Sequence, residues 1–400
     1  MKTSKQVKLW MTCISIIVLG TAGFATLNVC VTNSPYNAKP GDGGDDSAAF
    51  SSALTSIVSG GGGTLAVPAG KYTFSSRKAI DLKGATVAIA GSGKGVSRLE
   101  CTNAAGIWWF NNTANTNQLS ISNLSFIAAY GGGRSAGTAI QINHSSLCST
   151  AVTNLRMEHV GFNVAAKGDY FRKHIYTSYL QSPVFIDVLI IGSTNSESGF
   201  LINYGNNAYF NNCYCWSAGL AYTLSNYKGC VFFDRCNAVK NNTGYDISAI
   251  AVEYCTVDIL QVFALTRTNN VRIKNADEVD IVNAASDVDT VVTPFTDFVI
   301  DNCGTVNISG CSFHSPYDPI RTNICLKGSA TGAKTVKHNI FNTCLGWPTN
   351  SMKIIPGSEE QRAYLAAVAK YCVNGKINSD VTHMSGVTGV ENIDTPDFDH

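Results

Sequence analysis

Apolar positions follow two kinds of spacing along the chain, and the first of them is helical. Between residues 45 and 60, apolar side chains recur every three to four residues, which puts them on one helix face. They are Phe50, Ala53, Leu54, Ile57 and Val58. Asp45 and Asp46 suit the N-cap and the positive helix end, and glycines 60–63 end the helix. A strand over residues 64–67 is expected to follow.

From residue 121 onward the spacing is that of short β-type runs, built on a template of one apolar, two mostly polar and one apolar residue. The copies cover residues 121–124, 157–160, 185–188, 210–213, 233–236, 252–255, 273–276, 300–303 and 341–344. Between residues 188 and 303 they end at steps of 25, 23, 19, 21 and 27 residues. A second motif beginning at Gly199, Gly219 and Gly244 runs in phase. A repeat of about 22 residues, with some variation in its length, predicts a solenoid.

No helical spacing occurs within a repeat, so we expect each coil to hold short strands that stack on the next coil. The predicted fold is all-β, a right-handed parallel β-helix over residues 34–345. Equivalent positions would stack into one inward column: Val188, Cys213, Cys236, Cys255, Ala276 and Cys303. Small thiols pack well in such a column, and we favour reduced, packed cysteines over disulfides between coils.

The ends of a solenoid expose unpaired backbone groups and an open core. The helix over residues 45–60 is expected to cover the N-terminal end. In the C-terminal segment, residues 346–400, Ser358 and Gln361 form a capping box before an apolar stripe that reaches Cys372. This pattern predicts a short C-terminal helix followed by a polar tail.

Residues 1–25 combine a basic start, an apolar run and small residues at positions 23 and 25, which is typical of a cleaved export signal. An uncleaved membrane anchor is the alternative. The whole chain has 29 basic and 28 acidic side chains, and three lysines lie in residues 1–25, which leaves 26 basic against 28 acidic. No basic arm or patch supports nucleic-acid binding. We therefore expect a secreted protein, with a membrane-anchored or virion-surface location as the alternative.

The segments 36–42, 45–50 and 60–72 resemble the start of pectate-lyase-like β-helix proteins, in particular the rhamnogalacturonase/epimerase-type domain of secreted polysaccharide-degrading enzymes and phage tailspikes. The resemblance covers residues 34–345. It implies a parallel β-helix that takes a polysaccharide in a lateral groove and, by analogy with tailspikes, a homotrimer. It does not fix the reaction, because the family includes hydrolases, lyases, epimerases and non-catalytic proteins.

Two chemistries suit such a groove. Hydrolysis needs two carboxylates, and β-elimination of a uronate needs a base and a cation, often calcium, so calcium is the one cofactor expected and only for a lyase. Asp187, Asp234 and Glu253 occupy polar positions beside the inward column. Asp234 and Glu253, on adjacent coils, are the first candidate pair, and Asp246 is a further acid. The alternative is that these side chains cap the turns between strands.

Candidate binding residues lie in three places. Arg272-Ile-Lys274 resembles the substrate-binding R-I-K motif of polygalacturonases, although the other motifs of that family are missing and a solvated strand edge is the alternative. The insertion at 167–174 holds Tyr170, Arg172 and His174, which could grip an acidic sugar or form an ordinary solvated loop. Trp216 could stack on a sugar ring or pack in the core. No His/Cys spacing indicates zinc.

The sequence thus supports two hypotheses about function. The first is an enzyme that cleaves a polysaccharide as a hydrolase or a lyase. The second is a non-catalytic β-helix that binds glycans as a surface, capsid or adhesion protein. The fold resemblance and the lateral groove of a β-helix favour the enzyme, and no catalytic signature is present.

Overall fold

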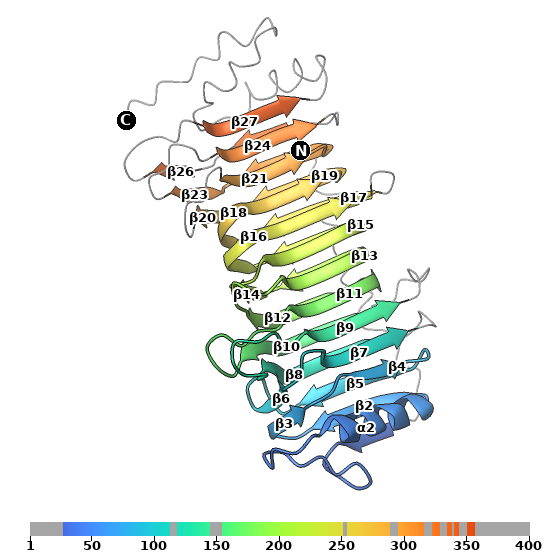
Figure 1. The fold of residues 1–400 in the computed structure, drawn as a ribbon. Helices are drawn as coiled ribbons and strands as arrows, with labels where there is room; N and C mark the ends of the chain where they lie inside the picture. The colour runs from blue at the N-terminus through green and yellow to red at the C-terminus, as the bar shows by residue number, and fades with distance from the viewer. Residues whose placement is uncertain are drawn as a thin grey trace, which may run out of the picture.

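The computed structural model describes residues 27–112, 118–144, 154–250, 254–288, 295–315, 322–328, 334–337, 340–343 and 350–356. The predicted export signal and the predicted C-terminal helix lie outside these residues. Every strand pairs in parallel with the equivalent strand one coil away, and Figure 1 shows the coils stacked from β2 to β27. The fold is the right-handed parallel β-helix that the repeat predicts.

Three sheets run along the stack, and long strands bend at a corner to join two of them. Sheet I consists of β1 (Leu27–Cys30), β2 (Gly62–Val67), β5 (Thr86–Gly91), the first halves of β8 (Leu119–Ala128), β10 (Leu155–Val164) and β12 (Val184–Ile191), the second halves of β13 (Ser198–Asn211) and β15 (Leu220–Asp234), β17 (Cys255–Leu260), β19 (Glu278–Val282), β22 (Thr305–Ser309) and β25 (Lys334–Lys337).

Sheet II follows sheet I in each coil. It consists of β3 (Gly70–Phe74), β6 (Ser97–Cys101), the second halves of β8, β10 and β12, β14 (Tyr214–Trp216), the first halves of β16 (Asn237–Ala249) and β18 (Phe263–Lys274), β20 (Ala285–Val288), β23 (Ser312–Ser315) and β26 (Ile340–Thr343).

Sheet III completes the coil. It consists of β4 (Lys78–Asp81), β7 (Gly106–Asn112), β9 (Thr138–His144), β11 (Lys173–Gln181), the first halves of β13 and β15, the second halves of β16 and β18, β21 (Thr296–Asp301), β24 (Thr322–Gly328) and β27 (Asn350–Pro356).

The core is a set of inward columns of identical or similar side chains. In sheet I, Phe185, Phe210 and Phe233 stack with ring centroids 4.8 and 4.6 Å apart. In sheet III, Tyr222 and Tyr245 stack at 4.9 Å, and both are fully buried. Their hydroxyls donate to backbone carbonyls of the neighbouring strand segments, so no buried polar group of these two rings is left unpaired.

Sheets I and II meet at a one-residue corner whose backbone is left-handed in successive coils. The corner residues are Asn123, His159, Asp187, Asn212, Arg235, Gln261, Asn283 and Gly310, with φ between 49° and 66°. Asparagine and glycine suit this conformation. Asp187, a predicted site residue, occupies one of these corners.

The predicted single cysteine column is wrong in its register. Cys213 and Cys236 do stack, as backbone hydrogen bonds from Asn237 to Cys213 and from Phe263 to Cys236 show. Cys255 instead pairs with Gly229 at the start of sheet I. Cys255, Ala276 and Cys303 lie together at a different corner, the one that follows sheet III, where the Asp277 amide donates to the Cys255 carbonyl and the Gly304 amide donates to the Ala276 carbonyl. No disulfide joins two of the ten cysteines in the described residues, and eight of these cysteines are buried.

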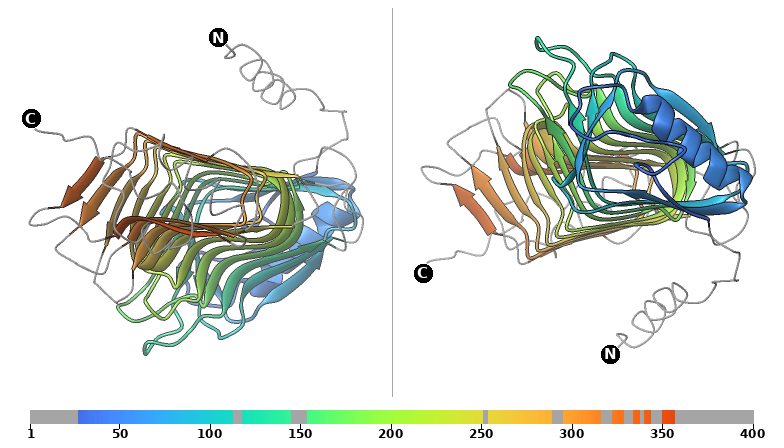
Figure 2. Two further views of the ribbon diagram at one scale, coloured as in Figure 1. Left: turned by 90° about the horizontal axis from the view of Figure 1, so that it is seen from above. Right: turned by 90° about the horizontal axis from the view of Figure 1, so that it is seen from below.

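Helix α2 (Ser47–Ser59) lies across the N-terminal end of the stack (Figure 2). Phe50 is fully buried, with ring centroids 5.2 Å from Tyr72 and 5.0 Å from Phe74. The expected caps act differently: Asp45 Oδ1 accepts from the Ser47 and Ser75 amides, and Asp46 accepts from Lys39 and Thr73. The acids therefore anchor the helix start to the first coil. No helix in the described part of the chain is long and apolar enough to cross a membrane.

Candidate functional site

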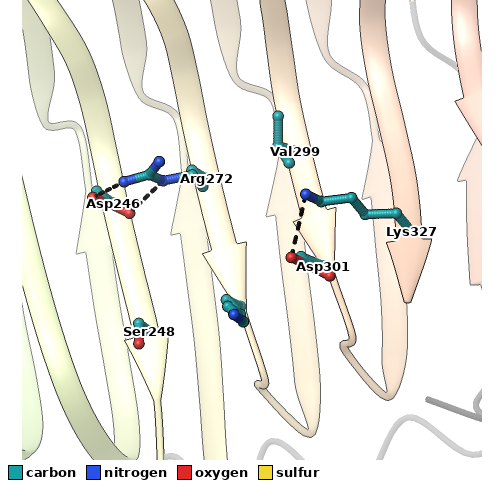
Figure 3. A pocket seen from close by; sticks show the side chains of 7 residues that line it. Asp246, Ser248, Arg272, Val299, Asp301 and Lys327 are labelled. Atoms are coloured by element: carbon teal, nitrogen blue, oxygen red, sulfur yellow. Dashed lines mark hydrogen bonds and ion pairs between the residues drawn. The ribbon is translucent and has the colours of Figure 1, made fainter. Parts of the chain in front are cut away.

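A pocket of 340 Å³ opens on the outer surface of sheet III, across four neighbouring coils. Its lining residues are Asp246, Ser248, Arg272, Lys274, Val299, Asp301 and Lys327. Strands β16, β18, β21 and β24 contribute them, as Figure 3 shows. The pocket is thus built by stacking, with residues from β16 to β24 brought side by side.

Strand alternation determines which side chains reach the pocket. Ile273 points inward and is fully buried, so Arg272 and Lys274 on either side of it point outward. The register then forms two outward columns. One contains Thr223, Asp246, Arg272 and Val299, and the other contains Ser225, Ser248, Lys274, Asp301 and Lys327.

Two ion pairs lie in the pocket (Figure 3). Arg272 binds both oxygens of Asp246, with Nε 2.8 Å from Oδ1 and Nη2 2.5 Å from Oδ2. These hydrogen bonds raise the pKa of Arg272, against the opposing effect of burial. Lys327 Nζ lies 3.3 Å from Asp301 Oδ2. Each carboxylate is therefore held by a cation from the next coil.

Lys274 is the third cation, and it is exposed. Among the ion pairs of the described residues none involves Lys274, although it stands in register between Ser248 and Asp301. The lining residues thus carry three positive and two negative charges. A ligand group with a single negative charge, such as a sugar carboxylate, would balance the one excess positive charge of the lining.

Sequence reasoning placed Asp246, Arg272 and Lys274 among the site residues, and the structure brings these three together. It leaves Asp187 elsewhere, at the corner of sheets I and II, where Lys94 lies 2.8 Å and His159 2.9 Å from Asp187 Oδ2. Burial opposes ionisation there, but the hydrogen bonds from Lys94 and His159 lower the pKa of Asp187.

The predicted pairing of Asp234 with Glu253 is wrong in register. Asp234 in sheet I stacks on Leu260 in the next coil and on Asn211 in the previous one. Its carboxylate accepts from Asn211 Nδ2 at 2.7 Å and from Arg235 Nε at 3.2 Å. Glu253 lies outside the described residues. Copies of the template occur at two different corners of the coil, so the template alone does not determine which copies stack on each other.

The remaining predicted ligands do not reach the pocket. His174 is fully buried, and its Nδ1 lies 2.9 Å from the Ser198 carbonyl oxygen. Burial lowers the pKa of His174 to about 4. The prediction that His174 is a surface ligand is therefore wrong. Arg172 lies 3.3 Å from Glu197, and Tyr170 forms a β-bridge with Ser135. Trp216 is 36% exposed, but on sheet II.

A carboxylate pair on sheet I was missed. Asp258 and Asp280 are in register on adjacent coils, and Asn307 follows them and donates to Asp280 at 3.0 Å. Burial, with the charges of Asp280 and Glu278, raises the pKa of Asp258 to about 7. The repeated tripeptides Val-Asp-Ile at 257–259 and 279–281, then Val-Asn-Ile at 306–308, were the available signal.

Aromatic rings precede this pair in the same outward column. Tyr209 and Phe232 stack with centroids 5.3 Å apart and planes at 3°, and Phe232 is in register with Asp258. No group of three or more His, Cys, Asp or Glu side chains suited to a metal ion occurs among the described residues.

A scan against protein-family models and a search of curated proteins found no match. Among solved structures, the A-module of mannuronan C-5 epimerase AlgE6 from Azotobacter vinelandii is 13% identical, with a TM-score of 0.36 over 82% of this chain and 99% of that one. The catalytic domain of a GH87 α-1,3-glucanase in complex with nigerose is 14% identical, with a TM-score of 0.40 over 83% and 68%. ORF18 of Geobacillus virus E2 is 12% identical, with a TM-score of 0.34 over 88% and 63%. These similarities concern the fold alone.

Proposed function

We propose that the pocket on sheet III binds an anionic, uronate-containing polysaccharide, and that the protein is a carbohydrate-active enzyme acting on that polymer. One observation carries the proposal. Lys274 is an exposed cation that lies between two ion pairs, Arg272–Asp246 and Lys327–Asp301, and each of these pairs has no net charge. A sugar carboxylate placed against Lys274 would balance the excess charge, and the Ser248 hydroxyl beside it offers a hydrogen bond to the ring substituents.

The pocket suits β-elimination better than hydrolysis. Elimination from a uronate requires that the sugar carboxylate be neutralised, so that the adjacent C–H proton can be removed by a base. Lys274 would neutralise the sugar carboxylate. Because Arg272 is bound to Asp246 and Lys327 to Asp301, a hydroxide from solvent would take the C–H proton, and the departing glycosidic oxygen would take a proton from water. Hydrolysis would need an undissociated carboxylic acid, whereas Asp246 and Asp301 are each held in an ion pair that favours the carboxylate.

The test compares wild type with Lys274→Gln on polygalacturonate, alginate and a neutral glucan. We expect wild type to bind an acidic polymer and release products with unsaturated, ultraviolet-absorbing ends. Lys274→Gln should lose about ten-fold or more in affinity. Lys83→Gln is the matched control, because Lys83 is also exposed but lies in the turn between β4 and β5, outside the pocket. Binding without any product would favour the glycan-binding alternative, and no binding would refute the proposal.

A second candidate function rests on the carboxylate pair of sheet I. Asp258, which holds its proton near neutral pH, is suited to act as a general acid, and Asp280 is suited to act as base or nucleophile. The ring stack of Tyr209 and Phe232 ahead of the pair would support a sugar ring. Reducing ends without unsaturation, abolished by Asp258→Asn and retained in Lys274→Gln, would establish this hydrolase instead of the lyase.

A further inference from the structure

Outside the pocket, a pair of stacked tyrosines marks the corner where sheet III passes into sheet I. Tyr179 and Tyr204 come from equivalent positions of β11 and β13, with ring centroids 5.0 Å apart and planes at 11°. Tyr204 is 37% exposed, one of the largest exposures among the aromatic side chains described. One face of the Tyr204 ring lies against Tyr179, and more than a third of Tyr204 is open to solvent.

The backbone at both tyrosines is unfavourable for a bulky residue. Tyr179 and Tyr204 each have φ of 57°, in the left-handed region that costs a residue with a side chain about 1–2 kcal/mol. One coil later the same corner is occupied by Asn226, with φ of 54°, a residue type that tolerates this conformation. The corner geometry alone thus calls for asparagine or glycine, and the two tyrosines offset its cost only in part, through the stacking of their rings.

Among the described residues, amide and hydroxyl side chains lie next to Tyr204 on its own coil and on the next one. Asn203 precedes Tyr204, and its Oδ1 accepts hydrogen bonds from Ser225 at 3.2 Å and from Asn226 at 3.1 Å. Asn203 also stacks on Ser178 in the outward column of sheet III. An exposed aromatic face beside amides and hydroxyls is the chemistry that recognises a sugar ring, whose C–H face packs on the aromatic and whose hydroxyls bond to the amides.

The register connects this surface to the pocket. Asn203, Ser225, Ser248 and Lys274 are consecutive members of one outward column. Three coil steps of about 4.8 Å separate Asn203 from Lys274 by about 14 Å. This span is longer than one sugar ring, so a chain anchored at Lys274 reaches the tyrosines only as an oligosaccharide.

We propose that Tyr179 and Tyr204 form a second sugar-binding subsite, which takes an uncharged ring face of the same polysaccharide chain that the pocket binds through Lys274. The inference rests on the proposed function of the pocket and adds a length requirement to it. A long oligosaccharide contacts both sites, whereas a short one contacts the pocket alone.

The test is titration calorimetry with polygalacturonate oligosaccharides of increasing length, on wild type and on Tyr204→Asn. Wild type should gain about ten-fold in affinity once the chain is long enough to reach Tyr204. Tyr204→Asn should bind short oligosaccharides like wild type and lose that gain. Its melting temperature should be equal or higher, because asparagine relieves the backbone strain. Tyr204→Phe keeps the ring and should keep the gain.

The matched control is Trp216→Ala, since Trp216 has 36% exposure but lies on sheet II. It should leave the length dependence unchanged. If Tyr204→Asn binds long oligosaccharides as wild type does, or loses short and long ones equally, the subsite is refuted and the pocket proposal stands. If wild type binds no oligosaccharide of any length, both proposals fail.

Discussion

The Arg272 side chain is fixed in the pocket by both carboxylate oxygens of Asp246. Lysine cannot reproduce this two-point contact, so we expect Arg272→Lys to weaken polygalacturonate binding several-fold. The free energy of unfolding should change by less than about 1 kcal/mol, because the arginine side chain is half exposed and exposed ion pairs contribute little. Calorimetry and urea denaturation measure the two effects. Arg98→Lys, at an ion pair with Glu100 whose arginine has a similar exposure, should leave binding unchanged.

Asp258 should make the fold less stable as the pH rises. Its pKa is about 7 in the folded chain, where burial is the main cause, against 3.8 for an ordinary aspartate. Between these values the folded state retains a proton that the unfolded state has released, so the penalty develops from about pH 4 to pH 7. Asp258→Asn should raise the free energy of unfolding at pH 8 by about 1–3 kcal/mol and change it little at pH 4.

Urea denaturation at both pH values checks this prediction. Asp81→Asn serves as the control, because Asp81 is an exposed residue. An equal gain at pH 4 and pH 8 would mean that the asparagine stabilises by packing or hydrogen bonding, and would contradict a titration effect.

Helix α2 stabilises the stack through its buried face. Phe50 is fully buried, and its ring lies 5.0 Å from Phe74 and 6.1 Å from Trp108 in the first two coils. Truncation to alanine leaves a cavity between helix and coils, so Phe50→Ala should cost about 3–5 kcal/mol of unfolding free energy. Ser52→Ala, on the exposed face of the same helix, should cost almost nothing. Similar losses in both variants would mean that helix propensity, not covering of the core, is what matters.

How far the sequence predicts this fold depends on the element. The amphipathic pattern of α2 and the coil template are local signals, and both appear in the structure. Register depends on coil length, which varies, and the template occurs at two different corners. Phe233–Cys236 therefore stacks on residues 259–262 and not on 252–255. The template also does not reveal the Asp258–Asp280 pair, because neither residue belongs to any of its copies.

Stacking also explains why one site residue was easier to identify than another. Asp246, Arg272 and Lys274 meet because successive strands of sheet III keep their register, and the short Arg-Ile-Lys motif already contains the alternation that points both cations outward. His174 lies in a charged, polar stretch, but its side chain packs edge-on against Phe162 and Phe171 inside the stack. Composition alone does not distinguish these two outcomes, since burial is decided by contacts between coils.

The stability of the whole stack should rise with pH between about 4 and 6.5. Burial lowers the pKa of both His144 and His174 from 6.5 to about 4, so in this interval the unfolded chain binds two protons that the folded chain does not. Asp258 acts in the opposite sense and retains one proton in the folded state. The net difference of about one proton gives a slope of about 1.4 kcal/mol per pH unit.

Urea denaturation at a series of pH values measures this slope, and Asp258→Asn makes the test specific. Removing the opposing aspartate leaves the two histidines alone, so the slope between pH 4 and 6.5 should become about twice as steep. His174→Phe in the same background should reduce it again by about half, because phenylalanine fills the apolar site between Phe162 and Phe171 without taking up a proton. A slope that is unchanged in both variants would show that other groups control the acid sensitivity of the coil stack.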